Sequence, residues 1–308
     1  MTAVIGVLAS CVGPPSSDAA GTWSPRASIV GGGRLEAAVV AWEGRLVVVG
    51  GFDRNLDIVA RVDAYDVETD AWTALEDMPV ALTHANAAVV GAKLYVLGGL
   101  AGVDFAGSGA AFVYENDAWS ELAPLPVGAE RGASGVAVDG TRIVLAGGSA
   151  GSVTLSSVLS FETTTGEWSA LPDLPSPRSH PVAASVGGTI VVIGGLSQVD
   201  GTGPLAETLV LEGDTWTPRA PMPTARGGCA SGILAGRFIC AGGETATSVV
   251  AATEAYDPAA DVWTTLAPML TPRAGTYGAS LADGLHVPGG ARVLMYIPSA
   301  LHEVLTWP

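Results

Sequence analysis

Short apolar runs alternate with tight turns along most of the chain. In the first such unit, residues 37–42 and 45–49 are mainly valine, alanine and leucine, and Glu43-Gly44 separates them. The arrangement recurs at residues 135–138 and 142–146, on either side of Asp139-Gly140. Apolar, β-branched runs that flank a glycine-containing turn predict an antiparallel β-hairpin.

Each predicted hairpin ends in a pair of glycines, and the pairs recur at intervals of 48, 49, 47, 48 and 47 residues, which is typical of a repeat protein. After each pair comes a third run that ends in an aromatic or large apolar residue. In five of the six units a fourth run follows, with a tryptophan 20 or 21 residues after the second glycine. The unit is therefore predicted to be four antiparallel strands. The pairs are Gly50-Gly51, Gly98-Gly99, Gly147-Gly148, Gly194-Gly195, Gly242-Gly243 and Gly289-Gly290. The third runs end at Tyr65, Tyr114, Phe161, Leu211, Tyr256 and Leu305, and the tryptophans are Trp72, Trp119, Trp168, Trp216 and Trp263.

A four-stranded sheet with two apolar faces cannot bury both of them alone, so tandem copies are expected to stack around an axis as a β-propeller. The glycine pair, followed by tyrosine and then tryptophan in a unit of about 50 residues, resembles the kelch repeat family. The resemblance covers roughly residues 21–308. It implies an all-β, six-bladed kelch-type propeller with four antiparallel strands per blade. Because such propellers host many unrelated functions, the resemblance implies a fold more than an activity.

The two ends of the chain are predicted to complete one blade together. The third run of the sixth unit is expected at residues 302–305. The given sequence runs only to Pro308, so a fourth run of the usual spacing does not follow. Near the N-terminus, the segment around Trp23 (residues 21–26) closely resembles residues 214–219 around Trp216. We therefore expect residues 21–25 to supply the outer strand of the sixth blade, which removes an unprotected sheet edge. This predicts one propeller domain over residues 21–308.

Residues 1–20 lie outside the repeats and indicate where in the cell the protein is located. The apolar run Val4–Ala9 leads into Leu8-Ala9-Ser10-Cys11, which resembles the lipobox of bacterial lipoproteins, and a linker with proline and serine follows at residues 12–20. The resemblance implies a truncated signal sequence, a lipid on Cys11 and an extracytoplasmic protein anchored to a bacterial membrane. The alternative is an unstructured apolar tail.

Composition narrows the classes of partner. The formal net charge is −16 and Lys93 is the single lysine, which argues against nucleic acid or an anionic membrane as a partner, because both need basic patches. The charge-free stretches at residues 143–161 and 179–199 are long enough for a membrane helix, but each holds a glycine pair in register with the repeat. They are predicted to be strand pairs. Membrane attachment is thus expected only through a lipid, and the protein is expected to be a monomer.

The other two cysteines, Cys229 and Cys240, are predicted to lie on the two strands of the fifth hairpin. With the turn at Ala235-Gly236, they lie diagonally from each other, which is poor geometry for a disulfide. We interpret them as two small buried thiols. No cysteine spacing is typical of a metal site, and the sequence predicts neither a metal nor a cofactor.

Candidate ligand contacts lie at the start of the first strand of each blade, because these strands line the channel of a propeller and the loops at one mouth converge there. Sixteen residues before each glycine pair, five of six equivalent positions hold arginine, and two residues later the residue type varies. Residues two apart share a face of a strand, so both sets are expected at one level of the channel. The first set is Arg34, Leu82, Arg131, Arg178, Arg226 and Arg273, and the second is Glu36, His84, Ala133, His180, Gly228 and Gly275.

A residue that recurs in nearly every blade is typical of the scaffold, where an arginine binds carbonyls or a carboxylate, whereas residues that break the pattern indicate function. A structural role for the two histidines is the alternative. Arg131 and Arg178 are predicted to bind an acidic group of the ligand. The predicted pattern-breaking contacts are Glu36, His84 and His180, with Asp53, Arg54 and Asn55 of the loop after the first glycine pair.

The resemblance leaves several function classes to weigh. Some kelch propellers are copper oxidases with a Tyr–Cys cross-link, but the two hairpin cysteines lack an accompanying histidine cluster. Six-bladed periplasmic kelch propellers include a sialic-acid mutarotase (N-acetylneuraminate epimerase), which needs an arginine for the sugar carboxylate and an acid–base pair. The candidate Arg, Glu and His residues match those roles. We favour a non-catalytic module that binds a protein or glycan at a bacterial cell surface or in the periplasm, with the mutarotase-like enzyme as the alternative.

Overall fold

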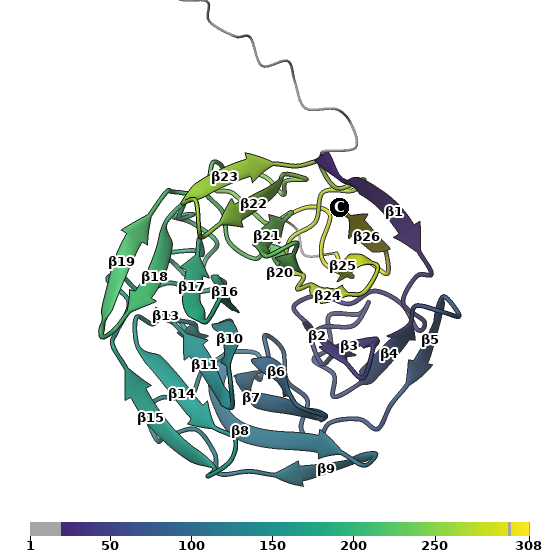
Figure 1. The fold of residues 1–308 in the computed structure, drawn as a ribbon. Coiled ribbons are helices and arrows are strands. Elements are labelled where there is room, and N and C mark those ends of the chain that lie inside the picture. Colours follow the sequence, from purple (N-terminus) through teal and green to yellow (C-terminus); the bar gives the residue numbers. More distant parts are fainter. Residues whose placement is uncertain (1–19, 295–296, 308) are drawn as a thin grey trace, which may run out of the picture.

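The structure, a computed structural model, describes residues 20–294 and 297–307. These residues form six four-stranded antiparallel sheets, arranged as blades around a central axis (Figure 1), which confirms the predicted propeller. Cys11 and the rest of the predicted lipobox lie outside the described residues.

The first three blades are β2 (Ala38–Trp42), β3 (Arg45–Val49), β4 (Val62–Asp66) and β5 (Ala71–Ala74); β6 (Ala87–Val90), β7 (Lys93–Ala101), β8 (Ala106–Glu115) and β9 (Ala118–Glu121); and β10 (Gly135–Asp139), β11 (Arg142–Ala146), β14 (Val158–Glu162) and β15 (Glu167–Leu171).

The remaining blades repeat this order, from an inner strand beside the channel to an outer strand at the rim. A two-stranded ribbon, β12 (Ser149–Ala150) with β13 (Val153–Thr154), is formed by the loop between β11 and β14. Blades four to six are β16 (Val182–Val186), β17 (Thr189–Ile193), β18 (Thr208–Glu212) and β19 (Thr215–Arg219); β20 (Ala230–Leu234), β21 (Arg237–Ala241), β22 (Thr253–Asp257) and β23 (Val262–Thr265); and β24 (Ala279–Leu281), β25 (Gly284–Pro288), β26 (His302–Thr306) and β1 (Thr22–Arg26).

The N-terminal strand closes the ring. β1, drawn in purple in Figure 1, pairs antiparallel with β26 at the other end of the chain, in a register that sets Trp23 opposite Leu305. The sixth blade thus gains its outer strand from the opposite terminus, as predicted. No outer edge of β26 is left open to pairing with another chain.

Apolar side chains fill the spaces between neighbouring blades. Each of the six buried clusters combines residues of two adjacent blades; one, for example, joins Val47 and Val49 of β3 to Leu94 and Val96 of β7. The blade tryptophans lie on the outer strands, each directly opposite the large residue that ends the third run. These pairs are Trp72 with Tyr65, Trp119 with Tyr114, Trp168 with Phe161, Trp216 with Leu211, Trp263 with Tyr256, and Trp23 with Leu305.

The same tryptophans also bind the neighbouring blade through their indole nitrogens. Each Nε1 donates a hydrogen bond of 2.7 to 3.2 Å to a main-chain carbonyl, so that the repeat residue both packs and aligns the blades. The acceptors are the carbonyls of Ala27, Glu76, Ala123, Pro172, Ala220 and Ala267.

Among the described residues, no helix has the length and apolar character needed to span a bilayer. The charge-free stretch at residues 143–161 contains most of β11 and nearly all of β14, and the stretch at 179–199 contains β16 and β17. Both are therefore strands of the propeller, as the glycine pairs indicated.

The prediction of two free thiols is wrong, because Cys229 and Cys240 form a disulfide. Their Cα atoms are 5.7 Å apart, within the range that a disulfide bridges. The predicted register is correct, since Ser231 pairs with Cys240. However, β20 begins only at Ala230, so Cys229 lies just before the strand and is not held at the diagonal spacing of a regular sheet.

Candidate functional site

A ring of six equivalent residues surrounds the entrance of the channel, one from each blade. All six have left-handed backbone conformation, with φ between 51° and 60°, which is costly for residues other than glycine. Around five of the six steps, the amide of one ring residue donates to the carbonyl of its counterpart in the adjacent blade, at 2.8 to 3.1 Å. The members are Glu36, His84, Ala133, His180, Gly228 and Gly275, called the ring positions below.

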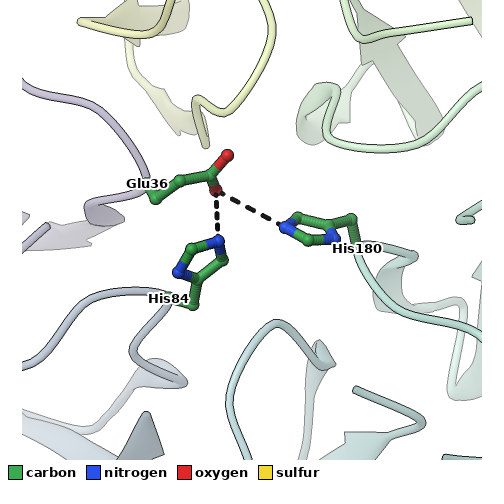
Figure 2. A group of neighbouring side chains, drawn as sticks. All are labelled: Glu36, His84 and His180. Carbon is green, nitrogen blue, oxygen red and sulfur yellow. Dashed lines mark ion pairs between the residues drawn. The ribbon is translucent and has the colours of Figure 1, made fainter. Parts of the chain in front are cut away.

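Three of the ring positions carry polar side chains, and these meet over the channel. Figure 2 shows Glu36, His84 and His180 pointing toward one another from three different blades. The Oε2 atom of Glu36 lies 3.5 Å from Nε2 of His84 and 3.7 Å from Nε2 of His180. The glutamate is only 5% exposed, and its Oε2 accepts no hydrogen bond from the described residues.

The two imidazole rings are oriented by the residues that precede them. Oγ1 of Thr83 lies 3.0 Å from Nδ1 of His84, and Oγ of Ser179 lies 3.2 Å from Nδ1 of His180. Both hydroxyl-bearing residues are fully buried. Because each hydroxyl is close enough to occupy Nδ1, the Nε2 atom of each ring is turned toward Glu36.

Burial keeps this group largely uncharged near neutral pH. It raises the pKa of Glu36 to about 8, with the carboxylate of Glu244 adding to the effect, and it raises the pKa of Glu244 itself to about 7. Burial lowers the pKa of His180 to about 4, and burial together with His180 holds the pKa of His84 well below its usual value. The imidazoles are therefore unprotonated at pH 7, with nitrogen lone pairs available.

The three polar ring positions line a cavity of about 790 Å³ at the mouth of the channel. Its polar lining includes Glu36, His84, His180 and Glu244, whereas its walls are mostly apolar and come largely from the loops after the glycine pairs. A separate cavity of about 380 Å³ follows the first strands of the blades along the channel. The apolar wall residues are Leu35, Phe52, Leu56, Ile58, Ala81, Leu100, Val103, Phe105, Leu196 and Val199.

An aromatic wall stands beside His84. The rings of Phe52 and Phe105 are 6.0 Å apart, and each lies within 6.3 Å of the His84 ring in an edge-on arrangement. Phe105 has φ 54°, a conformation that a bulky residue rarely adopts. Sequence reasoning missed both residues and Glu244, although the apolar Val103 and Phe105 between β7 and β8 differ from the mainly small residues of the loops at 149–154 and 245–248.

Arg131 and Arg178 do not reach this group. Both are buried, and their guanidinium groups bind within their own blades, Arg131 to the carbonyls of Gly147 and Ser157 and Arg178 to that of Gly194 and to Glu207. These two arginines therefore bind within the scaffold, which is the role that the recurrence of arginine in nearly every blade indicates.

The expectation that both sets share one face fails for a local reason. The ring position two residues after each arginine has left-handed φ, so the chain there is not an extended strand and the period of two does not apply. The arginine consequently turns into the blade, and the ring residue turns toward the channel.

Asp53 and Arg54 lie in a loop that contributes to the cavity, but neither lines it. Oδ1 of Asp53 accepts bonds from the amides of Asn55 and Asp57, at 2.8 and 3.0 Å, so this carboxylate shapes the turn. The exposed Arg54 points elsewhere, and the loop contributes Phe52 and residues 56–58 instead.

Comparison with known proteins agrees with the observed architecture. The family model of the KLHDC2/KLHL20/DRC7 Kelch-repeats domain matches residues 25–195, and the Kelch motif model matches residues 225–270. Kelch-like protein terF of Aspergillus terreus is 33% identical over 291 residues, which cover 84% of this chain and 63% of that protein. Kelch-like protein 35 of Mus musculus is 30% identical over 56% of this chain and 29% of its own length. Beta-scruin of Limulus polyphemus is 28% identical over 64% of this chain and 16% of its own length. The chain thus spans less than two thirds of each of these relatives.

Proposed function

The chain belongs to the kelch-repeat family, whose propellers are a protein-binding type of fold, and from this premise we propose that it is a non-catalytic module whose protein partner inserts an apolar side chain or loop into the channel mouth. The observation that carries the proposal is the cavity itself. A concave site with apolar walls and a few convergent polar groups is the usual form of a binding pocket.

The chemistry of the lining bears on what enters. No arginine or lysine is among the described residues that line the cavity, and its carboxyl groups are Glu36, Asp57 and Glu244. An acidic ligand group would therefore meet no cation there. The cavity instead offers Phe52, Val103 and Phe105, which favours an aliphatic or aromatic group of the partner.

The mutarotase-like alternative receives less support from this geometry. An acid–base pair is present in Glu36 and the adjacent histidines, but the arginines considered for the sugar carboxylate are buried in their blades. The same absence of lining cations weighs against an acidic glycan. The binding module is accordingly the function that the site supports best.

The proposal can be tested by photo-crosslinking from the cavity rim. We expect a benzoylphenylalanine introduced at Val103, which is fully exposed and lines the cavity, to crosslink a protein from an extract of the source organism. Val127 is 99% exposed but lies outside the cavity lining, and provides the matched control. Adding Ala81→Trp, which places a large ring in the cavity, should abolish crosslinking from position 103 only.

Equal crosslinking from both positions, or crosslinking that Ala81→Trp leaves unchanged, would contradict the proposed use of the cavity. Binding to a glycan array that is lost with Ala81→Trp would instead support the glycan alternative. Acceleration of sialic-acid anomer exchange, followed by NMR, would support the enzyme.

We further propose that the protein is extracytoplasmic and held at a bacterial membrane by a lipid on Cys11. The resemblance of residues 8–11 to a lipobox supports this, and so does the Cys229–Cys240 disulfide, because disulfides persist in oxidising compartments. Expressed from its gene with the native upstream sequence, the protein should fractionate with membranes, and Cys11→Ala should release it. A cytosolic wild-type protein would refute the location.

A further inference from the structure

We propose that Glu36, His84 and His180 form a binding site for a divalent first-row transition-metal ion, with open coordination positions that face the mouth cavity. The site consists of side chains of this chain alone. It is therefore independent of whether a protein partner enters the cavity.

The spacing of the three groups fits a metal ion better than direct contact. One ligand atom from each residue can be chosen so that all lie within 4.8 Å of one another, and the two Glu36–histidine distances are 3.5 and 3.7 Å. Bonds of about 2.0–2.1 Å to nitrogen and oxygen place two donors about 3.4 Å apart at a tetrahedral angle. Oε2 of Glu36 thus lies close to the separation from each histidine nitrogen that a shared ion requires, but too far from either for a good hydrogen bond.

The carboxyl oxygen that faces the histidines is buried and unpartnered. Side-chain exposure of Glu36 is 7%, and its Oε2 has no hydrogen-bond donor among the described residues. Such a group is costly to bury unless it is paired or binds a metal. An ion between Oε2 and the two Nε2 atoms would remove this cost.

Space is also reserved for the carboxyl group. A Cβ atom on Gly275, the adjacent ring position, would lie 2.3 Å from Oε1 of Glu36, so a larger residue there would displace this carboxyl group. Its φ of 59° also suits glycine. The sixth blade therefore accommodates the glutamate of the first.

The surroundings of the histidines resemble those of metal ligands. Metal-binding imidazoles commonly donate the hydrogen of their second nitrogen to an oxygen, which fixes the ring and the tautomer. Thr83 and Ser179 place such oxygens at Nδ1 of His84 and His180. This leaves both Nε2 lone pairs directed at the proposed ion.

The donor set indicates the class of ion. Two imidazoles and one carboxylate suit Zn²⁺ or Fe²⁺, and sets of this composition with open positions occur where the metal also binds a further ligand. Mg²⁺ and Ca²⁺ prefer oxygen ligands only. The remaining positions would be filled by water or by a donor atom of whatever occupies the cavity.

Titration of the purified, chelator-treated full chain with Co²⁺ tests the site. We expect one Co²⁺ per chain, with visible absorption of nitrogen and oxygen coordination, and displacement by Zn²⁺. His84→Ala and His180→Ala should each weaken Co²⁺ binding by more than about 100-fold, and Glu36→Gln should also weaken it. Thr83→Ala and Ser179→Ala, which remove the hydroxyl groups beside the two Nδ1 atoms, should weaken it by roughly 10-fold.

Two further measurements keep the result interpretable. Circular dichroism will show that each variant is folded, and His302→Asn, which removes a buried histidine on β26, should bind Co²⁺ like the wild type. Folded wild-type protein that binds neither Co²⁺ nor Zn²⁺ at 1 mM, about the weak end of specific affinities, would overturn the proposal. Binding that survives both ring-histidine substitutions would also overturn it. Neither outcome affects the crosslinking test, which does not depend on metal.

Discussion

Replacing Trp23 with alanine will lower the free energy of unfolding by about 3–5 kcal/mol, the usual cost of removing a buried tryptophan from a core. Trp23 is 6% exposed and packs with residues of the fifth and sixth blades, among them Ile239 and Leu305. Its Nε1 donates a 2.9 Å bond to the carbonyl of Ala267 in the fifth blade. The side chain therefore contributes to ring closure as well as to the core, and urea denaturation will measure the loss.

Trp216 is the matched control for this substitution. It is also 6% exposed, and its Nε1 donates a 2.7 Å bond to a carbonyl of the preceding blade, but its strand is continuous with its own blade. Trp216→Ala should lower the free energy of unfolding by a similar amount. If Trp23→Ala left the free energy of unfolding unchanged while Trp216→Ala lowered it, β1 would not close the sixth blade.

Deleting residues 1–26 should have a larger effect than either substitution. It removes all of β1 and exposes the edge of β26, so the truncated protein should associate or aggregate as well as lose stability. A protein that lacks only residues 1–19 should keep the stability of the full chain. If the longer truncation stayed monomeric with an unchanged melting temperature, closure by the terminal strand would be refuted.

The fold could be predicted from sequence because its determinants recur. Each blade carries its own hairpin turn, glycine pair and tryptophan, and their spacing fixes both the number of blades and the strand order. Even the closure was visible, because residues 21–26 resemble residues 214–219. A periodic signal of this kind needs no knowledge of contacts between blades.

The site could be predicted only in part. The departures from symmetry at Glu36, His84 and His180 were visible as single positions, but their meeting over the channel depends on ring geometry that one repeat does not encode. The direction of Arg131 and Arg178 was missed because left-handed φ at the next but one residue breaks the strand period. The disulfide was missed because Cys229 lies just outside its strand.

We infer that the polar side chains at the ring positions serve binding and not stability. In the combined variant Glu36→Gly, His84→Gly and His180→Gly, the ring would carry only glycine and alanine. Glycine relieves left-handed strain of about 1–2 kcal/mol per residue, which offsets its own entropic cost of about 0.5–1 kcal/mol. An unpartnered buried carboxyl is removed as well. Co²⁺ binding should be lost at the same time.

The most direct test is the free energy of unfolding of this triple variant, measured by urea denaturation beside Ala133→Gly, which changes a ring position of φ 53° without removing a polar group. We expect a value equal to or above that of the wild type for both proteins. A loss of more than about 2 kcal/mol in the triple variant alone, within the range expected for a disrupted core or buried network, would show that these side chains stabilise the propeller and would contradict the claim.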